Sequence, residues 1–131
     1  RGFLLKDENK AQVKVYDHPV PGGKTALTLY KTLAVENGLS LLECDLITGR
    51  THQIRAQFAA AGHPLLGDGK YGRERDNKQY GRSYQALYSY KLRFEFTTDA
   101  GCLNELNGRE WTVKDVDFVS EYFPDYPIGC P

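Results

Sequence analysis

The sequence predicts an α+β domain in which a mostly antiparallel mixed sheet carries a few helices. Three observations lead to this fold class. Several segments alternate apolar and polar residues with the period of two that half-buried strands show. Turns rich in Gly, Pro and Asn separate those segments. Two further segments space their apolar residues at the period of a helix.

The first half of the chain contains three expected strands. The first covers residues 12–18 and ends at a Pro/Gly turn. The second covers residues 24–38, where a helix is the lesser alternative; its predicted apolar face consists of Leu27, Leu29, Leu33 and Val35. A hairpin turn is expected at Asn37-Gly38, because this pair readily adopts positive φ. The third strand returns over residues 39–49, with Leu42, Cys44 and Leu46 on one face.

A helix is expected over residues 51–61, because Ile54, Phe58 and Ala61 fall on one helical stripe. Thr48 or Thr51 is the expected N-terminal cap, and Gly62 suits the C′ position.

The second half of the chain begins with a polar, Gly-rich segment, residues 67–83, which predicts an exposed loop. The alternation over residues 85–99 gives the clearest strand of the sequence. Residues 102–113 are compatible with a further hairpin strand around Asn107-Gly108. A final amphipathic helix is expected from Val116, Val119 and Phe123, with Thr112 and Asp115 as a loose capping box.

Length and composition fit one domain, since the chain has 131 residues of which 40% are apolar and 12% aromatic. No apolar run approaches the roughly 20 residues that span a bilayer, and no signal pattern is visible. Cys44, Cys102 and Cys130 are an odd number without a CxxC pair, which argues against a disulfide framework and favours a cytoplasmic location. The chain begins with Arg1 and contains no Met, so we expect a trimmed or internal piece of a longer protein.

The net charge is zero, but its distribution is uneven. Residues 48–82 contain seven Lys or Arg and three Asp or Glu, a local charge of +4. Such a segment suits a phosphate-bearing partner, although on charge alone a solvated loop is the more common explanation.

The most informative chemistry lies where the third strand meets the helix. The first N–H groups of a helix and its dipole favour an anion, and Arg50 adds a planar fork of donors at that point. His52 and His63 lack a metal-ligand spacing, so they are interpreted as surface or turn-stabilising residues. The Gly67–Gly72 stretch, GDGKYG, is a weak phosphate-loop candidate and is more often only a turn. Residue chemistry thus predicts an anion site without identifying a reaction.

The stretch LLECDLITGRTHQIR, followed by GHPLLGDGKYG, resembles the third motif of the RluA-type pseudouridine synthases. That motif has the form L-L-E-x-x-L-x-T-G-R-T-H-Q-I-R, then G-H-P-L-x-G-D-x-x-Y-G. Residues 26–33 and 85–96 resemble the family's flanking segments, and the C-terminal tail does so only loosely.

The resemblance implies an RNA-modifying isomerase that converts uridine to pseudouridine in structured rRNA or tRNA, without cofactor or metal. In this family the basic residue of the third motif pairs with a catalytic Asp, and the matching residue here is Arg50. Ile54 matches the apolar position that lines or supports the pocket. The RNA-contact candidates are His52, Gln53, Arg55, Lys70 and Arg73.

Two departures from the family matter. The chain lacks the H-R-L-D motif that carries the catalytic Asp, and it lacks the motif of the Tyr that stacks on uracil. We therefore expect residues 1–131 to be the C-terminal portion of a pseudouridine synthase catalytic domain, inactive alone. An uncovered sheet edge or apolar face would then favour self-association.

Two other classes remain open at this point. One is a non-catalytic RNA-binding module with the synthase fold. The other is a hydrolase or metal-dependent enzyme that uses His52, His63 and Asp68.

Overall fold

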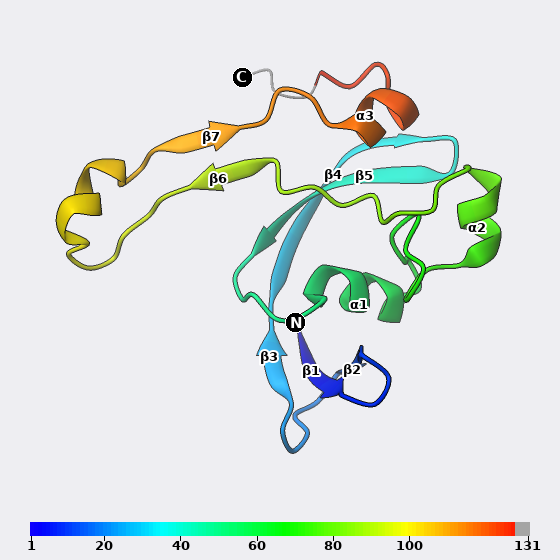
Figure 1. The fold of residues 1–131 in the computed structure, drawn as a ribbon, viewed down its shortest axis with the longest axis horizontal. Helices are drawn as coiled ribbons and strands as arrows, with labels where there is room; N and C mark the ends of the chain where they lie inside the picture. Colours follow the sequence, from blue (N-terminus) through cyan, green and yellow to red (C-terminus); the bar gives the residue numbers. More distant parts are fainter. Residues whose placement is uncertain (128–131) are drawn as a thin grey trace. The chain divides into compact units, whose positions relative to one another are not determined.

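The computed structural model describes residues 1–127, and Figure 1 shows its elements in chain order. The chain divides into two compact units. Unit 1 comprises residues 1–33 and 42–87, and unit 2 comprises residues 34–41 and the described residues from 88 onward. The strands pair in antiparallel fashion and alternate with short helices, which confirms the predicted α+β class. Cys130 lies outside the described residues.

A three-stranded sheet with the order β2-β1-β3 forms the base of unit 1. Its strands are β1 (Gly2–Asp7), β2 (Gln12–Tyr16) and β3 (Lys24–Ala26). β2 was expected from its alternation, whereas β1 was not. Leu4 of β1 faces Val15 of β2, and the same strand pairs with β3 on its other side.

Helix α1 (Gln53–Ala60) packs against β2 and was predicted correctly to within two residues at each end. The core that it covers is made of Leu4, Val13, Ala26 and Ala56, with Val15 and Tyr71 at its edge. Gly62 takes the predicted C′ position with φ +87°.

The face that α1 buries differs from the expected stripe. Its buried residues are Gln53 and Ala56, while Ile54 and Phe58 are half-buried. The reason is that the neighbouring backbone offers polar groups, which Gln side chains satisfy and apolar ones would leave unpaired.

The predicted strand over residues 24–38 is two strands, because the chain passes from one sheet to the next at Leu27. β4 (Thr28–Glu36) follows this break and pairs with β5 (Leu39–Leu46). Asn37 and Gly38 have φ of 51° and 77°, which confirms the hairpin turn.

The predicted apolar faces of this hairpin are wrong in part. Val35 is 71% exposed, and Leu29 and Leu46 are about half exposed. In the part of the chain that the structure describes, this sheet has only two strands, so alternation in the sequence does not bring burial with it.

The expected exposed loop at residues 67–83 contains a short helix, α2 (Glu74–Gln79), and two buried residues, Gly67 and Asp68. The prediction was wrong there because Asp68 has partners that lie elsewhere in the chain.

Unit 2 contains the two-stranded sheet of β6 (Lys91–Arg93) and β7 (Glu110–Thr112), with the 3-10 helix η1 (Gly101–Leu106) between them in sequence. The long strand predicted over residues 85–99 is therefore wrong except for β6, because a strand exists only where a partner supplies hydrogen bonds. The predicted strand over residues 102–113 is likewise reduced to β7. Leu92 and Trp111 face each other in this ribbon and are 56% and 48% exposed.

The final helix, α3 (Asp117–Tyr122), agrees with its prediction, since Val116, Val119 and Phe123 are all buried. Its cap does not: the N-cap is Val116, without a side-chain capping bond. None of the helices in residues 1–127 has the length and apolar character to cross a bilayer.

Candidate functional site

Arg50 lies in the short segment between β5 and α1 and is exposed. Its Nε donates a hydrogen bond to the carbonyl of Thr25, 3.0 Å away in β3. Its backbone N–H donates to Oε1 of Gln53 at 3.0 Å. Among residues 1–127 no acceptor holds the two terminal nitrogens of its guanidinium, so these can bind an anion from outside.

His52 is the N-cap of α1 and adopts a left-handed conformation with φ 53°. Thr48 and Thr51 do not cap the helix, contrary to the prediction. The His52 ring is half-buried, and its Nδ1 lies 2.9 Å from the hydroxyl of Tyr71. Burial lowers the pKa of His52, and the cations of Arg55 and Lys70 lower it further. The neutral imidazole is therefore favoured at this position.

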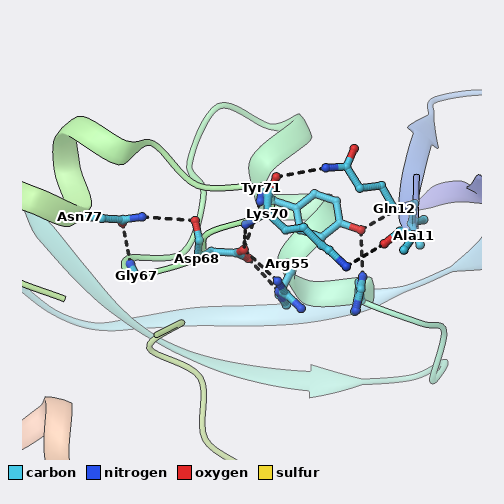
Figure 2. Close-up of polar contacts among 10 residues, drawn as sticks. Ala11, Gln12, Arg55, Gly67, Asp68, Lys70, Tyr71 and Asn77 are labelled. Atoms are coloured by element: carbon cyan, nitrogen blue, oxygen red, sulfur yellow. Dashed lines mark hydrogen bonds and ion pairs between the residues drawn. The ribbon is translucent and has the colours of Figure 1, made fainter. Parts of the chain in front are cut away.

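Arg55 and Asp68 form a two-pronged ion pair, which Figure 2 shows at the centre of a polar network. Nε and Nη2 of Arg55 each lie 2.8 Å from a different carboxylate oxygen of Asp68. The Asp68 side chain is completely buried and that of Arg55 is 15% exposed. The Arg55 guanidinium also lies over the ring of Tyr71, 5.3 Å from its centre.

The Asp68 carboxylate accepts two further hydrogen bonds from its own turn. The backbone N–H groups of Lys70 and Tyr71 donate to Oδ1 at 2.9 and 3.1 Å. Burial alone would raise the pKa of Asp68, but the hydrogen bonds from Arg55 and from these amides outweigh it and lower the pKa to about 2. The Gly67–Gly72 turn was a weak phosphate-loop candidate, and its N–H groups here bind an anion that belongs to the chain itself.

The network continues from this turn to the loop between β1 and β2 (Figure 2). The Tyr71 hydroxyl accepts the N–H of Val13 at 2.8 Å, and Lys70 Nζ donates to the carbonyl of Ala11 at 3.0 Å. On the opposite side, Asn77 accepts the N–H of Gly67 and donates to the carbonyl of Asp68. These contacts fix the turn to both of its neighbours.

The structure brings together three of the RNA-contact candidates, His52, Arg55 and Lys70, around Asp68 and Tyr71. Arg73 lies apart from them; its Nη2 donates to the carbonyl of Gly62 at the end of α1, at 2.9 Å. Gln53 is buried, at 3% exposure, and Ile54 is half-buried.

Sequence reasoning missed Asp68, Tyr71 and Asn77 as members of this network. An Asp between two glycines, just before Lys70 and Tyr71, signals a turn that the carboxylate caps. No spacing rule, however, reveals that Arg55 is the partner.

A metal-dependent site is not assembled from the predicted residues. The described residues contain no group of three or more His, Cys, Asp or Glu that could hold an ion. The Asp68 carboxylate is occupied by Arg55 and two amides, and His63 is exposed. The arrangement of His52, His63 and Asp68 therefore gives no support to a hydrolase.

Comparison with known proteins finds RNA pseudouridine synthases. Residues 4–60 match the family described as RNA pseudouridylate synthase. A ribosomal large subunit pseudouridine synthase D of Zymomonas mobilis is 36% identical over 106 residues, which cover 81% of this chain and 31% of that protein. An uncharacterized RNA pseudouridine synthase of Bacillus subtilis is 56% identical over 54 residues, 40% of this chain and 18% of that protein. The chain thus spans less than a third of the length of these relatives.

Proposed function

We propose that the chain is the C-terminal portion of a catalytic domain that isomerises uridine to pseudouridine in structured RNA, and the match of residues 4–60 to the RNA pseudouridylate synthase family supports this proposal. Relatives named as ribosomal large subunit synthases favour rRNA as the substrate, with tRNA as the other candidate. Such an enzyme takes the target uridine out of the base stack before the reaction.

We propose that Arg50 pairs with the catalytic carboxylate, which lies in a part of the enzyme outside the sequence given. The observation that carries this role is the state of Arg50. One guanidinium N–H is fixed to Thr25, and within residues 1–127 the two terminal nitrogens have no acceptor, which leaves them for an external anion. A carboxylate and a guanidinium match each other as two-pronged partners. Once both are buried, removal of Arg50 would leave a charge without a partner.

The other site residues take supporting roles in this proposal. In this proposal Ile54 lines or supports the uridine pocket, and Lys70 and Arg73 contact the RNA, a role that their exposed cations support. His52 is close enough to Lys70 to belong to the same surface. Gln53 and Arg55 use their polar atoms within the protein, so we propose that they support this surface and do not bind RNA themselves.

The test is the substitution Arg50→Ala in the intact enzyme. We expect kcat to fall by about 100-fold or more, since loss of one partner of a buried pair is worth about 3–5 kcal/mol. RNA binding should change far less. Pseudouridine formation on unmodified rRNA, measured under single-turnover conditions, gives the rate.

Arg75→Ala is the matched control, because it removes the same charge from an exposed position in α2. It should affect RNA affinity at most. Near-normal turnover by Arg50→Ala would refute the assigned role. The 131-residue chain assayed alone should show no turnover, and clear product from it would contradict the proposed division of the catalytic domain.

A further inference from the structure

We propose that Gln53 is a positioning residue for Arg50: its buried amide fixes the direction in which the guanidinium is presented. This inference deepens the proposed function and rests on it for the identity of the bound anion. The geometric part rests on contacts within this chain, in which Gln53 holds the main chain of Arg50.

The side chain of Gln53 uses its full hydrogen-bonding capacity while only 3% of the residue is exposed. Oε1 accepts hydrogen bonds from the Thr48 hydroxyl at 2.7 Å and from the Arg50 N–H at 3.0 Å. Nε2 donates to the carbonyl of Leu27 at 3.1 Å and to the hydroxyl of Thr28 at 2.8 Å. Among the side chains, only an amide can accept two hydrogen bonds and donate two at its end.

The neighbouring groups dictate which way this amide faces. The backbone N–H of Leu27 donates to the Thr48 hydroxyl at 2.9 Å, so the proton of that hydroxyl goes to Oε1 of Gln53. The carbonyl of Leu27 can only accept, so the amide nitrogen must face it. The flipped orientation would set two acceptors against each other, and each buried group without a partner would cost about 1–3 kcal/mol.

The network reaches one turn further along α1. The Thr28 hydroxyl accepts from Gln53 and donates to Oε1 of Gln57 at 2.7 Å. Gln57 in turn donates to the carbonyl of Ala26 at 3.3 Å. The helix is therefore attached to the β3–β4 junction by the amides of Gln53 and Gln57 and the hydroxyls of Thr28 and Thr48.

Arg50 is held at its main chain by Gln53 and at its side chain by Thr25. Its backbone N–H is fixed by Gln53, and its Nε is fixed by the carbonyl of Thr25, which lies on the strand that leads into the same junction. The side chain thus keeps one orientation while its terminal nitrogens remain available. Preorganisation of this kind reduces the entropy cost of forming an ion pair in the transition state.

If Gln53 only attached α1 to the sheet, its substitution would lower stability without a specific change in the order of Arg50. The first measurement therefore observes Arg50 directly. Amide order and Nε–H order of Arg50 are measured by ¹⁵N relaxation in the intact protein with labelled arginine.

Two variants each remove part of the hydrogen-bond network of Gln53, and a third keeps it. Gln53→Glu replaces the donor that faces Leu27 with an acceptor, and Thr48→Val removes the hydroxyl with little change in shape. Thr48→Ser keeps the hydroxyl and is the conservative rescue. Val13→Ala is the control for lost stability, because it shrinks the core beneath α1 at a residue whose side chain makes no hydrogen bond to Gln53, Thr48 or Arg50.

We expect Gln53→Glu and Thr48→Val to lose the order of the Arg50 Nε–H, while Thr48→Ser and Val13→Ala retain it. In the same protein kcat should fall about 10- to 100-fold in the first two variants, with KM for the RNA changed by no more than about threefold. Thr48→Ser should recover most of that loss.

The inference is overturned if Arg50 keeps its order in both Gln53→Glu and Thr48→Val, or if Arg50→Ala abolishes turnover while the kcat of these two variants falls no more than that of Val13→Ala. Failure of the proposed function looks different. Arg50→Ala would then turn over normally although the network variants still release Arg50, a result that supports the positioning by Gln53 and removes only its assigned target.

Discussion

At the scale of single residues, Asp68 shows how a buried charge is tolerated in this protein. Its carboxylate is fully buried and receives two bonds from Arg55 and two from backbone amides. Burial of an ion is costly, and the pair persists because each carboxylate oxygen has a partner. The lowered pKa of Asp68, about 2, reports that these bonds outweigh burial.

The stability of the fold should depend on Asp68 at acid pH. Because the pKa lies below its ordinary value of 3.8, the carboxylate stabilises the folded state above about pH 4 and ceases to do so as the pH falls toward 2. The contribution is about 2 kcal/mol at neutral pH, and about half of it is lost by pH 3. Urea denaturation at pH 7, 5 and 3 measures this loss.

Asp68→Asn should lack this part of the pH dependence and lose about 3 kcal/mol of unfolding free energy at pH 7, because Arg55 would remain buried without its partner. Asp76→Asn is the matched control, since its pair with Arg73 is exposed and 3.9 Å long. It should change stability by no more than about 0.5 kcal/mol. An equal fall with pH in wild type and Asp68→Asn would contradict the assignment.

At the scale of elements, sequence patterns correctly predicted the features that depend on neighbouring residues alone. The Asn37-Gly38 turn, helix α1 and the buried stripe of α3 follow from φ preferences and helical period, and the structure confirms them. Most of the strand predicted over residues 85–99 was wrong because pairing depends on a partner strand, and in the described part of the chain the β7 segment pairs only with residues 90–94. At the site, Arg50 could be singled out from the sequence, whereas the Arg55–Asp68 pair depends on a turn that meets α1 in space.

The turn at Asp68 requires a glycine at position 67. Its φ is +82°, and a Cβ there would collide with the carbonyl of Tyr84. Gly67→Ala should therefore lower the free energy of unfolding by about 3 kcal/mol, the sum of backbone strain and overpacking. Thermal or urea unfolding of the purified protein checks it.

Gly81→Ala provides the comparison for backbone strain alone. Gly81 has φ +67°, but a Cβ there meets open space, so we expect a cost of about 1 kcal/mol. Equal losses in the two variants would show that the contact with Tyr84 does not matter.

At the scale of the whole molecule, the two units differ in how their strands are covered. β1 lies between two neighbours, and residues of β1, β2 and β3 form a buried core with α1. All six residues of the β6–β7 ribbon are exposed. A two-stranded ribbon of this length gains little stability by itself. Self-association through such exposed residues stays a prediction.

Hydrogen exchange should reveal this difference. We expect the backbone amides of β1 and β2 to exchange at least about tenfold more slowly than those of β6 and β7, because core strands open only with large-scale unfolding. Peptide-resolved exchange by mass spectrometry measures both sets in one sample. Comparable or slower exchange in β6 and β7 would indicate that something covers the ribbon in solution.

The hydroxyl of Tyr71 accepts the N–H of Val13, 58 positions earlier in the sequence. This long-range bond affects the order in which parts of the fold form. During synthesis the β1–β2 hairpin leaves the ribosome long before Tyr71 does. Contacts between such distant residues close large loops and form late. The Arg50 segment, whose bonds reach back only 25 residues to Thr25, can therefore form first. The bonds from the Asp68 turn to the β1–β2 hairpin would then form after the Arg50 segment is in place.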